Sequence, residues 1–166
     1  MVKKTTKALS AMFVALSAAL LLTMSMSVVY ATASIPVNGT WYTTIPGSAI
    51  TEQAGKSDNY IVTISDYTQA WTGDISGTAS YDGRWITHVG NPTWVNSRGH
   101  YTIEATVFGK SGTLYIEGVT NSGNPQPSTW RIVGGTDELA NLHGEGTFVG
   151  PVAGVYTYTG QVHFDP

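Results

Sequence analysis

Apolar and polar residues alternate with a period of two along much of the chain after residue 33, which is typical of β-strands that bury one face. The clearest examples are residues 68–80, 100–108 and 155–164. Residues 109–112, Gly-Lys-Ser-Gly, predict a hairpin turn into a further strand at 113–119. Helical periodicity is nearly absent, so the pattern predicts an all-β fold of about eight or nine short, hairpin-connected strands.

Segments rich in β-branched and aromatic residues also predict strands, at 35–45 (beginning near Gly39) and 60–65. Loops are predicted where periodicity is lost, at residues 46–57, 89–99 and 121–128. Asp82–Gly83 fits either a tight turn or a bulge within a longer strand. Trp85 and Trp94 lie near predicted loops, where they form a binding platform or pack over one end of the domain.

Residues 134–150 form the most unusual segment of the chain. A glycine pair, Gly134–Gly135, ends one strand, about one helical turn follows, and a strand resumes at 147–149. Thr136 or Asp137 is expected to cap this turn through its side chain. Leu139 and Leu142 are three residues apart and share one side, so we predict that they close one end of the β structure.

Glycine content favours a strongly curved sheet. All 19 glycines lie after residue 33, and Gly73 and Gly77 occupy the apolar face of segment 68–80, where a missing side chain lets a strand coil sharply. Closing such a sheet on itself removes its exposed edges. The sequence therefore predicts a single antiparallel eight-stranded barrel over residues 34–166, with a two-sheet sandwich as the alternative.

The first 33 residues have the pattern of an export leader. Three lysines precede an apolar run over residues 8–30, and Ala31-Thr32-Ala33 resembles a cleavage site. The run is also long enough to span a bilayer, so residues 1–33 are a signal peptide or an N-terminal anchor helix. The domain is expected to be exported, either free outside the cell or tethered to the outer face of the cytoplasmic membrane.

Charge and cysteine content exclude several classes of partner. Three of the eight basic residues lie in the leader, which leaves five against 11 acidic ones, a formal charge of −6 (5 − 11). No basic patch for nucleic acid is expected, and contact with membrane is expected only through the N-terminal segment. With no cysteine, the exported domain has neither disulfides nor a thiolate zinc site. Asn38 begins an N-glycosylation sequon or simply precedes a strand.

Ionisable residues show no catalytic or metal-ligand spacing. His88, His100, His143 and His163 are far apart, so no metal site is predicted, and no metal or organic cofactor is expected. Glu104, Glu117 and Arg131 lie on predicted strands, but the alternation places Glu104 and Glu117 on the outer face, where solvation or pairing across strands is expected.

Several motifs together resemble an uncharacterised microbial family, a domain of unknown function. They are Gly73-Asp74-Ile75-Ser76-Gly77, the Gly-Lys-Ser-Gly hairpin, residues 134–148 and the Tyr-x-Tyr terminal strand. The resemblance implies an allene oxide cyclase-like (calycin-like) barrel of eight antiparallel strands. The spacing within 134–148 also looks like the equivalent turn of plant allene oxide cyclases and dirigent proteins. Those enzymes act on apolar molecules, which implies a small apolar ligand here, although none of their polar site residues matches a position in this sequence.

Aromatic residues at inward positions are the candidate ligand-binding residues: Trp71, Tyr81, Tyr101, Tyr156 and Tyr158. An eight-stranded barrel is just wide enough to be filled by side chains or to hold one small ligand. We therefore expect an exported barrel that binds a small apolar or aromatic molecule. The alternatives are a cofactor-independent isomerase or cyclase acting in the same cavity, and a surface module with a filled barrel. The sequence leaves the oligomeric state open.

Overall fold

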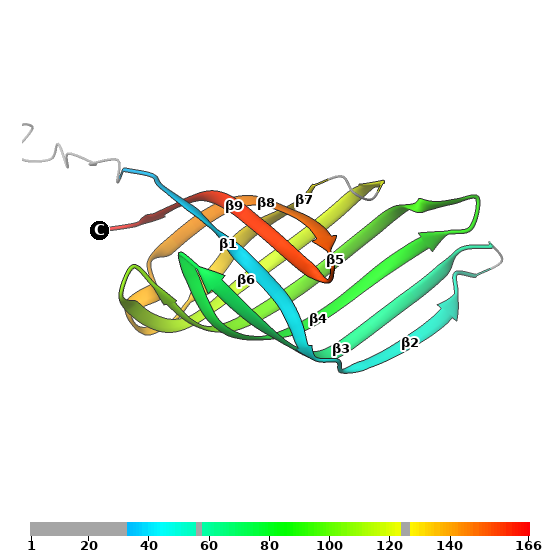
Figure 1. The fold of residues 1–166 in the computed structure, drawn as a ribbon, viewed down its shortest axis with the longest axis horizontal. Helices are drawn as coiled ribbons and strands as arrows, with labels where there is room; N and C mark the ends of the chain where they lie inside the picture. The colour runs from blue at the N-terminus through cyan, green and yellow to red at the C-terminus, as the bar shows by residue number, and fades with distance from the viewer. Residues whose placement is uncertain (1–32, 56–57, 124–126) are drawn as a thin grey trace, which may run out of the picture. The chain divides into compact units, whose positions relative to one another are not determined.

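The computed structural model describes residues 33–55, 58–123 and 127–166. These residues form nine antiparallel strands and one short 3₁₀ turn, η1 (Figure 1). In chain order the elements are β1 (Ile35–Ile45), β2 (Ser48–Gln53), β3 (Tyr60–Gly73), β4 (Ile75–His88), β5 (Asn91–Val107), β6 (Lys110–Gly123), β7 (Ser128–Gly135), η1 (Asp137–Leu139), β8 (Leu142–Val152) and β9 (Val155–Phe164).

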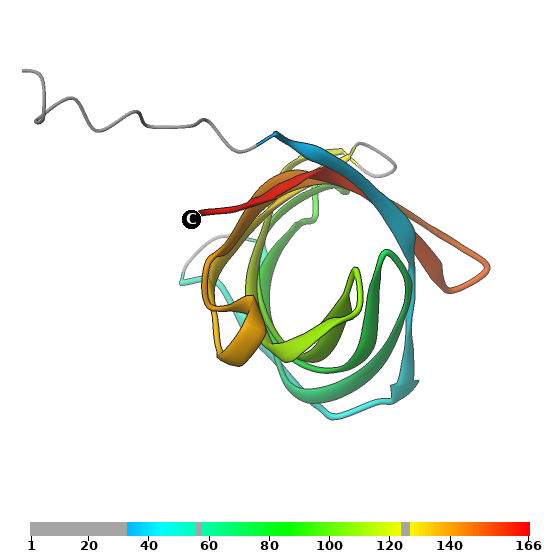
Figure 2. The ribbon, with the colours of Figure 1, turned by 90° about the vertical axis from the view of Figure 1, so that its left-hand side faces the viewer.

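Strand β1 closes the sheet into a barrel. It pairs with β9 on one side and with the second half of β3 on the other, so eight strands form a ring, seen end-on in Figure 2. Strand β2 is the ninth and continues along the first half of β3. All six of its residues are exposed, as expected for an edge strand. The predicted eight-stranded antiparallel barrel is therefore confirmed, and the sandwich alternative is wrong.

Turn η1 closes one end of the barrel. Leu139 and Leu142 are both fully buried and pack into the main hydrophobic core, as predicted. The predicted side-chain cap is wrong, because no side chain caps the turn. The Thr136 hydroxyl instead accepts a hydrogen bond from the Thr113 N–H and donates one to Asp137. The 134–150 segment is thus anchored to β6 as well as to the core.

Aromatic rings inside the barrel lie over glycines of neighbouring strands. The Trp130 indole covers Gly146 and Gly160, where an added Cβ would come within 2.7 and 2.4 Å of the ring, respectively. Tyr81 lies in the same way over Gly83 and Gly99, where an added Cβ would come within 2.7 and 2.3 Å of its ring, respectively. Each large ring occupies the space that a glycine leaves empty. The high glycine content and the aromatic core are therefore parts of one packing scheme.

Tyr158 ties β9 to the hairpin between β3 and β4. Its hydroxyl accepts a hydrogen bond from the Ile75 N–H at 2.7 Å and lies 3.0 Å from the Ile75 carbonyl oxygen and 3.2 Å from that of Thr72. Burial raises the pKa of Tyr158 to about 12, so the phenol keeps its proton and donates it to one of these carbonyls. The hairpin end is therefore held by a side chain from the opposite end of the sequence.

The single strand expected at 68–80 is wrong, because the chain reverses at Gly73–Asp74 into strands β3 and β4. The alternation continues through this turn because each pair of facing residues, such as Trp71 with Gly77, has the same parity. Facing residues of an antiparallel pair point to the same side of the sheet. The inward assignment of this segment was therefore correct although the turn was missed.

Segments predicted as loops are largely strands. Residues 48–53 form β2, residues 91–99 belong to β5, and β6 continues to Gly123. Residues 56–57 and 124–126, which belong to two of the predicted loops, lie outside the described residues. Asp82–Gly83 lies within β4, and the register shift is on β3, between Ile64 and Tyr67. These strands lack a clean apolar pattern because they extend to the open end of the barrel, where neither face is fully buried.

Residues 1–32 of the predicted leader, which spans residues 1–33, lie outside the described residues, so the leader remains a prediction. No helix in the described ranges is long and apolar enough to cross a membrane. Asn38 is part of β1 rather than a turn before it, and its side-chain amide donates a hydrogen bond to Asp74 at 2.9 Å.

Replacing Gly160 by alanine should destabilise the barrel by about 1–3 kcal/mol, the usual cost of overpacking a core. The new Cβ would lie 2.4 Å from Trp130 Cζ2 and 2.4 Å from the Glu145 carbonyl oxygen. Urea denaturation followed by tryptophan fluorescence measures the change. Gly90→Ala is the matched control, since no atom lies within 4 Å of a Cβ there, and equal stability of the two variants would refute the packing scheme.

Replacing Tyr158 by phenylalanine should also lower the free energy of unfolding, by about 1–3 kcal/mol, because the buried Ile75 N–H loses its acceptor. Tyr115→Phe removes a hydroxyl from a ring that is 41% exposed and serves as the control. Equilibrium denaturation of both variants checks the expectation, which fails if Tyr158→Phe is as stable as the wild type.

Candidate functional site

A cavity of about 380 Å³ lies inside the half of the barrel opposite η1. Its mouth is bordered by residues near the ends of β4 to β8, among them Trp85, Ser97, Ser128 and Pro151. Gly83, Gly99 and Gly118 face one another across β4, β5 and β6 at this level. The Tyr81 ring covers Gly83 and Gly99, and the volume that remains near the mouth forms the cavity, whereas the η1 end is filled by leucine, isoleucine and valine.

Three of the five predicted aromatics converge on this cavity. Tyr81, Tyr101 and Tyr156 all border it, and the Tyr81 and Tyr101 ring centroids are 4.5 Å apart. Burial raises the pKa of Tyr81 to about 12, and it also raises the pKa values of Tyr101 and Tyr156. The Tyr101 hydroxyl interacts with that of Tyr81. These phenols stay neutral at physiological pH and provide polar groups without charge.

The other two predicted residues do not border the cavity. Trp71 and Tyr158 are 3% and 0% exposed and pack against each other beneath it, with ring centroids 5.4 Å apart. The Trp71 indole N–H donates a hydrogen bond to the Gln69 side-chain oxygen at 3.3 Å. The Tyr158 hydroxyl is used by the hairpin. Both residues are inward, as predicted, but in this structure they support the cavity rather than line it.

Trp41 and Gln69 border the cavity and were not predicted as site residues. Trp41 lies in the closing strand, opposite Trp71 on one side and Tyr156 on the other, and its ring stacks on Tyr156 with centroids 3.9 Å apart. Its indole N–H is buried and has no hydrogen-bond partner among the described residues. Gln69 is 1% exposed. The only sequence signal for either residue was its inward position. For Gln69 this position was notable because it placed a polar residue on an apolar face.

Trp85 and Trp94 do not form a shared platform. Trp85 borders the cavity, whereas Trp94 is 41% exposed. Val95 and Ser97 on the same strand also border the cavity, so the alternation directs Trp94 to the other face of the sheet. Trp85 therefore belongs to the mouth of the barrel.

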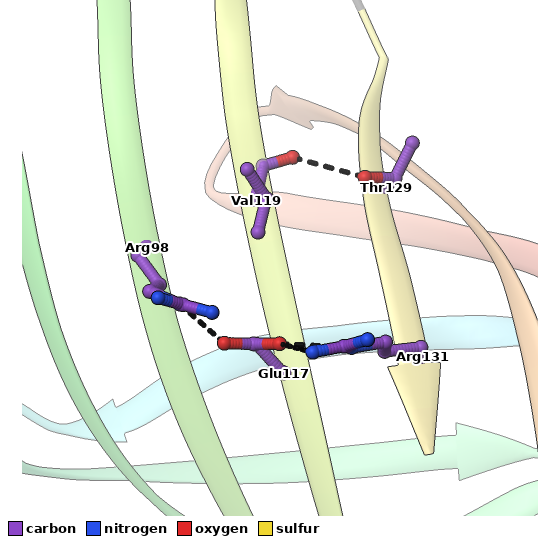
Figure 3. A network of polar contacts seen from close by, with 5 residues as sticks. All are labelled: Arg98, Glu117, Val119, Thr129 and Arg131. Atoms are coloured by element: carbon purple, nitrogen blue, oxygen red, sulfur yellow. Dashed lines mark hydrogen bonds and ion pairs between the residues drawn. The ribbon is translucent and has the colours of Figure 1, made fainter. Parts of the chain in front are cut away.

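An ion-pair network lies on the outer face of the barrel. The Glu117 carboxylate is held between Arg98 of β5 and Arg131 of β7 (Figure 3). Its side chain is only 5% exposed, but both arginines that cover it are 63% exposed. Hydrogen bonds from Arg98, which has the larger effect, and from Arg131 lower the pKa of Glu117. The expected cross-strand pairing is confirmed for Glu117, and Glu104 is exposed and bonded to Thr113, so neither carboxylate lies in the cavity.

The histidines lie outside the cavity. His143 and His163 face each other on β8 and β9, and each lies near the Asp165 carboxylate, at 3.2 and 3.4 Å. His88 hydrogen-bonds to Asn96, and His100 faces Asp82 across β4 and β5. Within the described ranges, no three histidine, aspartate or glutamate side chains are arranged to hold a metal ion.

The Glu117 network predicts a pH dependence of stability. The folded-state pKa of Glu117 is lowered below the ordinary value of about 4.3. The contribution of Glu117 to the free energy of unfolding is therefore fully present above that value and is lost as pH falls through the folded-state pKa. Wild type should therefore be more stable than Glu117→Gln at pH 7, and the difference should shrink below about pH 4. Denaturation at both pH values tests this, with Glu52→Gln on exposed β2 as the control. A pH-independent difference would contradict the assignment.

Comparison with known proteins identifies a family. The family model for DUF3224, proteins of unknown function, matches residues 39–160. A crystal structure of a DUF3224 protein of unknown function from Shewanella oneidensis MR-1 is similar, with a TM-score of 0.66 and 14% sequence identity, over 81% of this chain and 99% of that one. No curated protein matches the chain. At this identity the structure supports the fold alone, whereas the family model covers most of the chain. The protein therefore belongs to the DUF3224 family, whose function is unknown.

Proposed function

We propose that this protein is an exported β-barrel that binds a small, uncharged, apolar or aromatic molecule in the cavity bordered by Tyr81, Tyr101 and Tyr156. The observation that carries the proposal is the contrast between the two halves of one barrel. The η1 end is closely packed, whereas a volume of about 380 Å³ remains near the mouth between aromatic walls. This volume lies within the range usual for small-molecule sites.

The chemistry of the lining favours binding over catalysis. Of the described residues, the side chains that border the cavity are aromatic, aliphatic, hydroxyl or amide, and none is a carboxylate, a histidine or a lysine. General acid–base catalysis uses a group with a pKa near the working pH, but the cavity tyrosines keep their protons well above it. The cofactor-independent isomerase thus lacks a base at this position. The filled-barrel surface module does not account for the cavity.

Export is proposed from the leader pattern of residues 1–33 and accords with the absence of cysteine throughout the chain. An extracellular or membrane-tethered barrel with an aromatic cavity is suited to capturing molecules that are poorly soluble in water. The cavity contains rings that provide a large contact area and few polar atoms, so selection by shape and apolarity is expected.

Blocking the cavity tests the proposal. Ser97 borders the mouth on β5, and Ser97→Trp should weaken binding of the uncharged dye N-phenyl-1-naphthylamine at least about tenfold, because the indole would occupy the ligand volume. Fluorescence titration measures the affinity. Thr102→Trp adds the same ring to an exposed position of the same strand and should bind the dye as the wild type does. Absence of dye binding by the wild type, or equal binding by both variants, would overturn the proposal.

A further inference from the structure

Gln69 is a polar residue on the apolar face of β3, and it borders the cavity while being only 1% exposed. A buried amide away from water carries a free-energy cost unless its donors and acceptor find partners. Such a side chain in a wall that is otherwise aromatic, aliphatic or hydroxyl therefore calls for a physical reason.

The hydrogen bond from Trp71 fixes the orientation of the Gln69 amide. An indole N–H can only donate, so the Gln69 atom that it meets at 3.3 Å must be the oxygen. The amide nitrogen is then the remaining polar atom and carries two N–H donors. Among the described residues the Gln69 side chain makes this one hydrogen bond, through its oxygen, so its nitrogen remains available as a donor at the cavity wall.

A second donor lies in the same wall. The Trp41 indole N–H is buried and also lacks an acceptor among the described residues, and Trp41 borders the same cavity. Gln69 and Trp41 come from β3 and β1, the two strands that meet at the seam of the barrel, where Gln69 faces Thr43 and Trp41 faces Trp71. The Trp41 nitrogen is fully covered by protein, so the Gln69 nitrogen is the donor of these two that a molecule in the cavity can reach.

We propose that the cavity selects uncharged, ring-containing molecules that carry a carbonyl-type hydrogen-bond acceptor, and that the Gln69 amide nitrogen donates to this acceptor. This inference rests on the proposed binding function and adds its specificity. A carbonyl oxygen accepts hydrogen bonds from N–H groups without bringing a charge. This matches the described lining residues, none of which is ionised to neutralise a charge. Aromatic side chains that border the cavity, among them Tyr81, Trp85 and Tyr156, give a flat ring a large apolar contact area.

The experiment compares 1-indanone with indane, two bicyclic probes that differ only in the carbonyl group. In wild-type protein labelled with ¹⁵N, the Gln69 side-chain amide signal, assigned by its absence in Gln69→Met, should shift with 1-indanone and much less with indane. In Gln69→Met the dissociation constant for 1-indanone should rise about tenfold while that for indane changes little. Gln161→Met, an exposed glutamine near the other end of the barrel, is the control and should bind both probes as the wild type does.

The outcomes separate the two proposals. If wild type binds both probes but the Gln69 signal responds equally to each, or if Gln69→Met leaves the ratio of the two affinities unchanged, the donor role is wrong and the binding function stands. If neither probe binds wild type, the binding function fails and the specificity with it. If Gln69→Met does not fold, triple-resonance assignment of wild type labelled with ¹³C and ¹⁵N identifies the Gln69 signal, and the comparison of the two probes on wild type still gives an answer.

Discussion

Pairing of β1 with both β9 and β3 is the interaction on which the structure depends. Without it the chain would form an open sheet with two long unpaired edges, and the apolar face of that sheet would meet water. The seam also brings Trp41 between Trp71 and Tyr156, so the closing hydrogen bonds and the densest group of aromatic contacts lie at the same place. The strand that closes the barrel therefore also forms part of the cavity wall.

The division of the barrel into a packed half and a hollow half follows from where rings and glycines face each other. Trp130 lies over Gly146 and Gly160 and so fills the space that they leave. Around Gly99 and Gly118, Tyr81 and Tyr101 cover the glycines, and a cavity bordered by both rings remains toward the mouth. The same residue types thus produce close packing at one level and a site for a small molecule at another.

Charge is kept on the outside of this barrel. The Glu117 side chain is shielded from solvent by its two arginine partners on the outer face, not by the core. The polar atoms inside belong to tyrosines that keep their protons, to hydroxyls, to indoles and to one amide. An interior of this kind can orient a neutral molecule through hydrogen bonds, but it would bind an ion poorly because none of the described residues in its wall compensates a charge.

The sequence by itself determined which residues face inward, because alternation with a period of two needs no knowledge of the neighbouring strands. It correctly placed Trp71, Tyr81, Tyr101, Tyr156 and Tyr158 inside, predicted the eight-stranded barrel, and assigned Leu139 and Leu142 to its closed end. Only the tertiary structure decided how deep each residue lies. Depth along the barrel depends on strand register and on the turns, and the alternation passes unchanged through the turn at Gly73. For that reason the sequence could not separate Tyr81, at the cavity, from Tyr158, in the support beneath it, or show that Gln69 and Trp41 would meet at the seam.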